Sequence, residues 1–174
     1  MKLKKILIAE ILLLIALFAL SGCIGVKNPP RDSGNISLLD LPIKTYHVDY
    51  GDLWIGKNVN QRKVYLHKNQ ITDYFFAHAS SRIVFDIPEG VKSFNAWGVR
   101  PHGDEAVVVG SWCYIIKIDG KEAFHSRALS EYKNSEVPIN VQIPTGAKVI
   151  ELIVDNMHNG FCDHSIWAVP VFRK

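Results

Sequence analysis

The sequence predicts an all-β fold, an antiparallel β-sandwich or jelly roll, and three observations support this prediction. From Ile36 onward, short runs rich in Val, Ile, Phe and Tyr are separated by turn signals about every 8 to 12 residues. No segment in this stretch has the apolar spacing of an amphipathic helix. Hydrophobic residues make up 48% and charged residues 21% of the 174 residues, which gives enough apolar side chains for one globular core.

The first 22 residues are predicted to be a lipoprotein signal peptide. Three lysines among the first five residues give a positive start, and residues 6–20 are apolar except for Glu10. This run has the length of a signal peptide and is short for a membrane-spanning helix. It ends in Leu20-Ser21-Gly22-Cys23, which resembles the lipobox of prokaryotic lipoproteins. We therefore expect Cys23 to be lipidated and the chain to be anchored in the cell membrane, facing outside. The alternative is an uncleaved signal anchor with the same orientation.

Residues 23–35 are predicted to be a linker, because Pro, Gly, Ser and Asn interrupt them and nothing in them is periodic. Residues 36–174 then form one domain. Its turns are marked by Pro88-Glu89-Gly90, by Asp119-Gly120 and by the segment 144–147. We expect strands over residues 81–87, 92–99, 106–119, 122–126, 137–143, 149–154 and 165–172.

Two cysteines remain after lipidation of Cys23, namely Cys113 and Cys162. Outside the cytoplasm two thiols can pair, and both residues lie next to predicted loops that can meet at one end of a sandwich. A disulfide between Cys113 and Cys162 is one interpretation. The other is two separate buried cysteines that pack as small apolar side chains.

Charge and motif content argue against two classes of function. The formal net charge is +3 and the leader carries +2 of it, so the domain is near neutral and lacks the basic surface of a nucleic-acid-binding protein. No Gly-x-Ser-x-Gly or phosphate-loop motif of an enzyme occurs. Asp104 and Glu105 are adjacent, so in a strand they would point to opposite faces and could not act as paired acids.

Seven histidines raise the hypothesis of a metal site. None has a His-x-x-x-His spacing. His158 and His164 share a loop with Asp155, Cys162 and Asp163, which is the nearest approach to a zinc cluster. The alternative is that these loop side chains bind each other or solvent. The residues alone assign no metal.

Four segments, in this order, resemble the NPCBM domain, a carbohydrate-binding module first noted beside the catalytic domain of family 98 glycoside hydrolases. The resemblance covers about residues 36–172. The segments are Ser37-Leu38-Leu39-Asp40-Leu41, the stretch from Tyr74 to Ser81 around His78, Asp119-Gly120-Lys121, and Asp163-His164-Ser165-Ile166-Trp167. Two glycines that precede the histidine in the family are Tyr74 and Phe76 here, and Ala168-Val169 replaces an Ala-Asp pair. The resemblance implies a galactose-binding-like jelly roll whose ligands sit in loops at one end. It also implies that a structural calcium is common in the fold.

Sugar recognition needs a flat aromatic face and a few fixed polar groups. We predict a ligand-binding site at the loop end that lies between Trp97 and Trp112, with the family motifs beside it. Trp112 is the expected stacking face. The expected hydrogen-bonding residues are His78, Arg100, Asp163 and His164.

The sequence therefore predicts a lipid-anchored surface protein that binds glycans, galactose-containing ones among them, and catalyses no reaction. No cofactor is required, and structural calcium follows only from the resemblance. The alternative is a structural or adhesion module that binds another envelope protein, which a large exposed aromatic patch without a polar cleft would favour.

Overall fold

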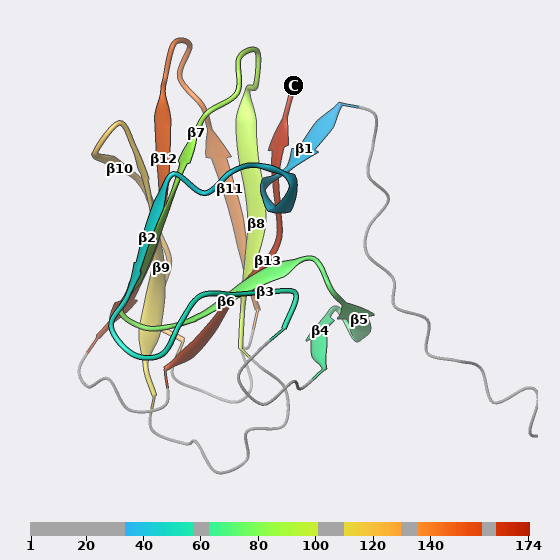
Figure 1. Cartoon of the computed structure of the whole chain (residues 1–174), viewed down its shortest axis with the longest axis vertical. Coiled ribbons are helices and arrows are strands. Elements are labelled where there is room, and N and C mark those ends of the chain that lie inside the picture. Colours follow the sequence, from blue (N-terminus) through green and yellow to red (C-terminus); the bar gives the residue numbers. More distant parts are fainter. Residues whose placement is uncertain (1–33, 58–62, 101–109, 130–135, 158–162) are drawn as a thin grey trace, which may run out of the picture.

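The computed structural model describes residues 34–57, 63–100, 110–129, 136–157 and 163–174. The predicted all-β sandwich is confirmed: two antiparallel sheets face each other across the core (Figure 1). In the described part of the chain, the helical structure is a single 3-10 turn, η1 (Leu38–Asp40), and no helix there is long and apolar enough to cross a membrane. The predicted signal peptide, Cys23 and all but the end of the linker lie outside the described residues.

Each sheet brings together strands that are far apart in the sequence. The six-stranded sheet has the order β11 (Glu136–Gln142), β8 (Ser93–Val99), β13 (His164–Arg173), β6 (Tyr74–His78) and β3 (Trp54–Ile55), and β1 (Asn35–Ser37) pairs with the end of β13. The five-stranded sheet has the order β10 (Lys121–His125), β9 (Trp112–Ile118), β12 (Val149–Asn156), β7 (Ser81–Asp86) and β2 (Thr45–Val48). A separate hairpin consists of β4 (Val64–Leu66) and β5 (Asn69–Ile71).

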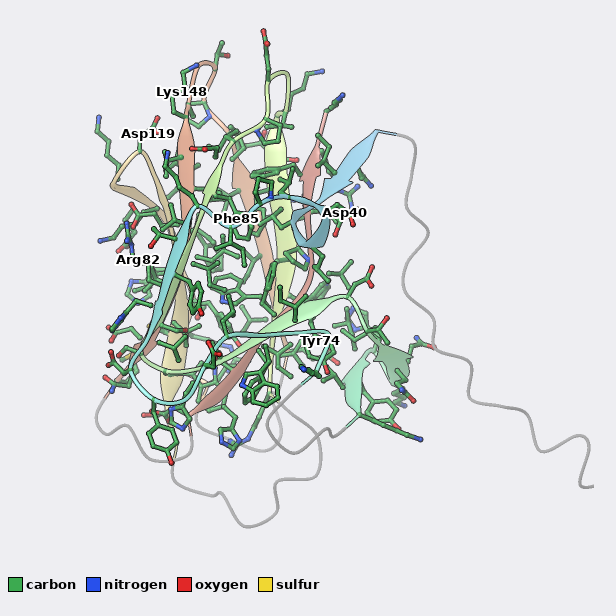
Figure 2. All side chains as sticks on the ribbon, viewed as in Figure 1. Asp40, Tyr74, Arg82, Phe85, Asp119 and Lys148 are labelled. Atoms are coloured by element: carbon green, nitrogen blue, oxygen red, sulfur yellow. The ribbon has the colours of Figure 1, made fainter. Side chains whose placement is uncertain are left out.

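The main core lies between the two sheets. It is formed by the apolar side chains that alternate with more exposed residues along the strands. In β11, Val137, Ile139 and Val141 are buried and their neighbours are partly or fully exposed. Phe85 enters the same core from β7 of the opposite sheet (Figure 2). Complete burial of such a side chain contributes roughly 1.5–3 kcal/mol, so this layer supplies most of the driving force for folding.

A second, smaller core covers the outer face of the six-stranded sheet. The hairpin β4–β5 lays Val64, Leu66 and Ile71 over Tyr74 and Phe76 of β6. All five residues of β6 are therefore buried, because the strand has a core on each face. A strand that is buried on both faces has no polar–apolar alternation, which explains why β6 gives no strand pattern in the sequence.

The strand boundaries agree with the prediction over the second half of the chain. β7, β8, β10, β11, β12 and β13 fall within two residues of predicted strands. The predicted strand 106–119 is shorter: β9 begins at Trp112, and residues 106–109 lie outside the described residues. The Asp119-Gly120 hairpin joins β9 to β10 as predicted, and Asp119 lies beside Lys148 at one end of the sandwich (Figure 2).

Candidate functional site

The five predicted ligand-binding residues lie at one end of the sandwich, the end that is lower in Figure 1. β6 and β8 end here, and β9 and β13 begin here. His78 pairs directly with His164, and Val99, which precedes Arg100, pairs with Ile166. The sequence prediction therefore placed these residues at a common end of the fold.

Strand alternation divides the five residues between two layers. Tyr74 and Phe76 belong to the outer core, so His78, two residues further along β6, lies on the outer face of the six-stranded sheet. His164 lies on that face too, with its ring 5.5 Å from the ring of Phe76. Arg100, Trp112 and Asp163 lie behind this face, in the buried end of the main core.

Trp112 does not offer a stacking face, which corrects its predicted role. The side chain is fully buried, and the Arg100 guanidinium carbon lies 5.4 Å from the ring centroid. A cation over the ring is a stabilising contact and occupies the surface a sugar would use. Trp167 is also fully buried and packs edge-on against Tyr114, as expected for a core side chain.

Asp163 is buried beneath the surface rather than placed on it. Its exposed fraction is 0%, and neither carboxylate oxygen has a hydrogen-bond partner among the described residues. Burial raises the pKa of Asp163 to about 6, and the nearby His78 and Arg100 and the Ser111 backbone counteract part of that rise. The predicted direct contact between Asp163 and a sugar is therefore not possible in this arrangement.

A row of three rings lies on this outer face, and Tyr50 is its exposed member. The Tyr50 ring lies edge-on to His78 at a centroid distance of 5.4 Å, and His78 lies edge-on to His164 at 5.3 Å. Tyr50 is 74% exposed, whereas His78 is largely buried and its Nδ1 lies 2.9 Å from the Ala79 carbonyl oxygen. We call Tyr50, His78 and His164 the ring row.

Sequence reasoning missed Tyr50. It follows the short strand β2 in a turn and precedes Gly51, whose positive φ of 80° reverses the chain. An aromatic residue next to a turn glycine is a weak signal, and no periodicity distinguishes it. Its position beside His78 depends on the pairing of β2 with β7, which the sequence does not reveal.

Cys113 is a free, buried thiol in the structure, and its sulfur lies 3.3 Å from Nε2 of His125. Burial raises the pKa of this thiol, and the charges of Asp155 and Glu122 raise it further. A raised pKa is the opposite of what a nucleophilic cysteine needs. Cys162 lies outside the described residues, so the disulfide stays a prediction.

The described residues do not form a calcium or zinc site. No group of three or more His, Cys, Asp or Glu side chains in that part of the chain is placed to hold a metal ion. The carboxylate oxygens of Asp163 have no hydrogen-bond partner among the described residues, but the Arg100 guanidinium already brings positive charge near them. His158 and Cys162 of the predicted loop cluster lie outside the described residues. Structural calcium stays a prediction of the resemblance.

The model of the NPCBM/NEW2 domain family matches residues 34–173, which is the whole described fold. The chain belongs to the NPCBM/NEW2 family. A comparison with curated proteins gives no match. The predicted family is thus confirmed, and with it the galactose-binding-like jelly roll.

Solved structures of carbohydrate-binding modules share the fold of this NPCBM/NEW2 domain. One is CBM51-2 with the INT domains of Clostridium perfringens ZmpB in complex with GlcNAc: the identity is 24%, the TM-score is 0.70, and 80% of this chain and 31% of that chain are covered. Another is the CBM51 of C. perfringens GH95 in complex with methyl-galactose, with 17% identity, a TM-score of 0.68, and 79% and 99% of the chains covered.

A third is the tandem CBM51 pair of the family 98 glycoside hydrolase Sp3GH98 of Streptococcus pneumoniae. Its identity is 17% and its TM-score 0.67, with 87% of this chain and 52% of that chain covered. The NPCBM/NEW2 chain spans 31% of the two ZmpB structures that contain CBM51-2 and INT domains, and 15% of the one that contains the M60 catalytic domain. At these identities the likeness shows the fold.

Proposed function

We propose that this NPCBM/NEW2 domain binds neutral glycans at the ring row and catalyses no reaction on them. The observation that carries the proposal is the exposed Tyr50 ring in edge contact with His78, which in turn contacts His164. The membership of the chain in a family of carbohydrate-binding modules supports the choice of ligand, as do the two fold neighbours that hold GlcNAc and methyl-galactose.

The ring row supplies both kinds of contact that a sugar requires. The Tyr50 ring offers a flat apolar surface to the C–H face of a pyranose, and the neighbouring imidazole rings bring polar groups close to its hydroxyl groups. Asp163 and Arg100 lie beneath as positioning residues, since their charges act on His78 and on each other without touching the ligand. Such a shallow site buries little of the ligand, so we expect an affinity near the millimolar scale, about −4 kcal/mol.

The rival function, a docking module for another protein, lacks a supporting observation. Only four large hydrophobic side chains are exposed among the described residues: Tyr46, Tyr50, Ile55 and Met157. They do not amount to the extended apolar patch that such a function would favour.

Calorimetry of the full chain against a panel that includes methyl galactoside and GlcNAc tests the proposal. Tyr50→Ala and His164→Ala should each weaken binding about tenfold, the effect of losing one good contact. Tyr46→Ala, which removes an exposed tyrosine from the middle of β2, is the matched control and should bind normally. If no glycan binds, the function fails. If a glycan binds and both site variants retain full affinity, only the site assignment fails.

Lipid anchoring is the second part of the proposed function, and it is supported by the sequence Leu20-Ser21-Gly22-Cys23 after a positive, apolar leader. One acyl chain gives only marginal anchoring, so we expect two or more on the mature protein. Cys23→Ser should release the chain from membranes or leave its leader uncleaved. A variant that is processed and fractionates like the unmodified sequence would contradict the anchor.

A further inference from the structure

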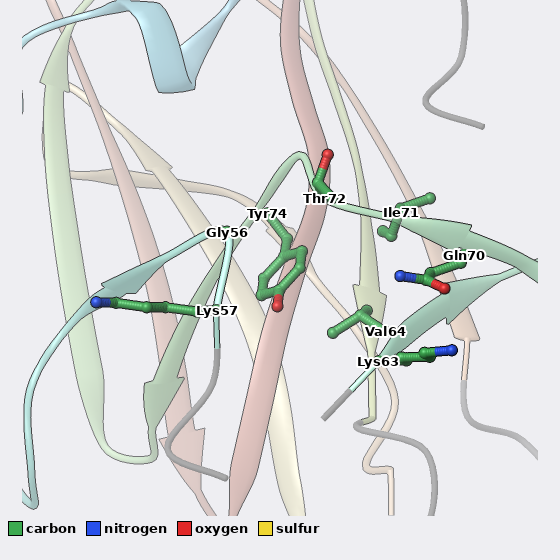
Figure 3. A pocket seen from close by; sticks show the side chains of 8 residues that line it. All are labelled: Gly56, Lys57, Lys63, Val64, Gln70, Ile71, Thr72 and Tyr74. Atoms are coloured by element: carbon green, nitrogen blue, oxygen red, sulfur yellow. The ribbon is translucent and has the colours of Figure 1, made fainter. Parts of the chain in front are cut away.

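A pocket separate from the ring row opens beside the outer core. Its volume is about 370 Å³, within the range of small-molecule sites, and it lies between the chain that follows β3 and the hairpin β4–β5 (Figure 3). Tyr74 forms part of its wall. Tyr74 and His78 are four residues apart on β6, so the pocket lies about 13 Å from the ring row along the strand.

The wall of the pocket combines polar and apolar side chains. The Tyr74 side chain is 3% exposed and forms part of the pocket wall, where its ring carries a hydroxyl group. Gln70 adds a side-chain amide to the same wall. Burial raises the pKa of the Tyr74 phenol, so its hydroxyl stays protonated and can donate a hydrogen bond at neutral pH. Val64 and Ile71 add an apolar surface beside these groups.

The charge at the pocket is positive. Lys57 and Lys63 line it on either side of the Tyr74 ring, and no Asp or Glu is among its lining residues (Figure 3). Lys57 lies at the rim because Gly56 turns the chain with a φ of +63°, and a Cβ there would lie 3.1 Å from the Thr72 carbonyl oxygen. The Lys57 ammonium is 5.0 Å from the Trp54 ring centroid, and neither lysine has an acidic partner among the described residues.

The wall formed by the hairpin is held in place. Glu136 of β11 accepts a hydrogen bond from the His67 backbone N–H at 2.8 Å, and its other oxygen lies 2.9 Å from His67 Nδ1. The His67 ring also packs edge-on against Trp97 at 4.4 Å. Since a two-stranded hairpin is marginal alone, these contacts keep the pocket formed before any ligand arrives.

We propose that this pocket binds a carboxylate-bearing sugar residue, with Tyr74 and Gln70 bonding its hydroxyls and Lys57 and Lys63 its carboxylate. The choice of a sugar rests on the proposed function, whereas the requirement for negative charge rests on the pocket itself. Two lysines without acidic partners among the described residues favour an anion. Their ammonium groups point away from each other in Figure 3, so both flexible stems turn inward when the carboxylate binds. The domain then has two sites on one face, one for neutral and one for acidic residues.

The test compares two ligands that differ only at C6, methyl β-glucuronide and methyl β-glucoside, by amide NMR titration of the full chain. We expect the glucuronide to bind more tightly and to shift amide signals of residues 56–57, 63–64 and 70–74. Binding should weaken as salt rises from 20 to 200 mM, because surface charges are screened. Shifts confined to Tyr50, His78 and His164 would overturn the pocket and leave the proposed function standing.

Substitutions in the pocket separate the contribution of the lysine charges from that of the Tyr74 hydroxyl. Lys57→Gln with Lys63→Gln should weaken glucuronide binding about five- to tenfold, the effect of two exposed charge contacts, and should leave the glucoside unaffected. Lys121→Gln with Lys148→Gln removes the same charge at the other end of the sandwich and is the matched control. Tyr74→Phe keeps the buried ring and should lower the affinity for both sugars at this pocket. Equal glucuronide affinity in the two double variants would overturn the proposal, as would no glucuronide binding at all.

Discussion

Tyr114 fills the space that a side chain at residue 98 would need. A Cβ on Gly98 would lie 2.4 Å from Cε2 of the Tyr114 ring, far inside van der Waals contact. The ring is fixed by its hydroxyl, which shares its one proton between the carbonyl oxygens of Val99 and Ile166, each 3.0 Å away, and accepts from the Ile166 N–H at 3.2 Å. The tyrosine of one sheet is thus bonded to two strands of the other, β8 and β13.

Gly98→Ala should lower the free energy of unfolding by about 2–4 kcal/mol, because the ring cannot move aside without breaking those bonds. Chemical denaturation measures the loss. Gly34→Ala is the control, since no atom lies within 4 Å of a Cβ there. Equal midpoints for the two variants would show that the contact is absent.

Asp163→Asn should make the protein more stable at neutral pH. Burial raises the pKa of Asp163 from 3.8 to about 6, so the folded chain binds its proton more tightly than the unfolded chain does. The free energy of unfolding therefore falls as pH rises from about 4 to 6, by up to roughly 3 kcal/mol. We expect the variant to melt higher at pH 7.5 and the same at pH 4.

The exposed Asp86→Asn is the matched control for that pH series, and it should change little at either pH because exposed ion pairs contribute at most about 1 kcal/mol. Since Asp163 lies beneath the ring row, its amide variant should also keep glycan affinity within about threefold, unlike His164→Ala. A lower melting temperature at pH 7.5 would mean that the carboxylate has a partner that holds the fold together.

Asp119→Ala should loosen the end of the sandwich opposite the ring row. Oδ1 of Asp119 accepts from the backbone N–H groups of Lys148 and Val149 at 3.1 and 2.9 Å, which joins the β9–β10 turn to β12. Asp119 also has a φ of 48°, which Asp tolerates better than Ala. We expect a loss of about 1–2 kcal/mol by thermal denaturation, and a smaller loss for Asp119→Asn.

Glu136→Ala should release the hairpin β4–β5 without unfolding the domain. It removes both contacts to His67, so amide hydrogen exchange should rise over residues 64–71 while the melting temperature changes little. Glu122→Ala, which removes a looser His125 contact in the other sheet, should leave that exchange unchanged. Equal hydrogen exchange over residues 64–71 in the two variants would show that the Glu136 contacts do not hold the hairpin.

The state of Cys113 has two outcomes that mass analysis distinguishes. If the predicted disulfide forms in the exported protein, its mass without reductant is 2 Da lower than with reductant, as the loss of two hydrogens requires. If Cys113 stays free, its burial and raised pKa predict slow alkylation under native conditions and fast alkylation after unfolding.

The sequence predicted the strands whose two faces differ. Val137 to Ile143 alternates because one face of β11 meets the core and the other meets solvent. The pattern is lost in β6, which has a core on each side, and β3 has only two residues. Neither strand could be predicted from periodicity, so the outer core and the pocket beside it were not foreseen.

The sequence placed the site residues at one common end of the fold, but it did not predict which of them are buried. The family motifs predicted His78 and His164 as site residues, and the antiparallel pairing of β6 with β13 places them side by side. Burial of Trp112 and Asp163 depends on how β9 and β13 face each other across the core, and one sequence carries no signal for that. Tyr50 comes from a third part of the chain, brought there by β2.

Asn35 pairs with Arg173, so the polypeptide enters and leaves the domain at a single point. β13 runs ten residues from there to His164, about 30 Å. A domain attached through either end therefore holds the ring row at the end farthest from the attachment point. Residues 23–34 reach at most roughly 40 Å when extended. A domain tethered at Cys23 would therefore stay within that distance of its anchor, with the ring row on the side facing away from the anchor. Many such tethered domains on one surface would retain a long glycan by multivalent binding, even though each single contact is weak.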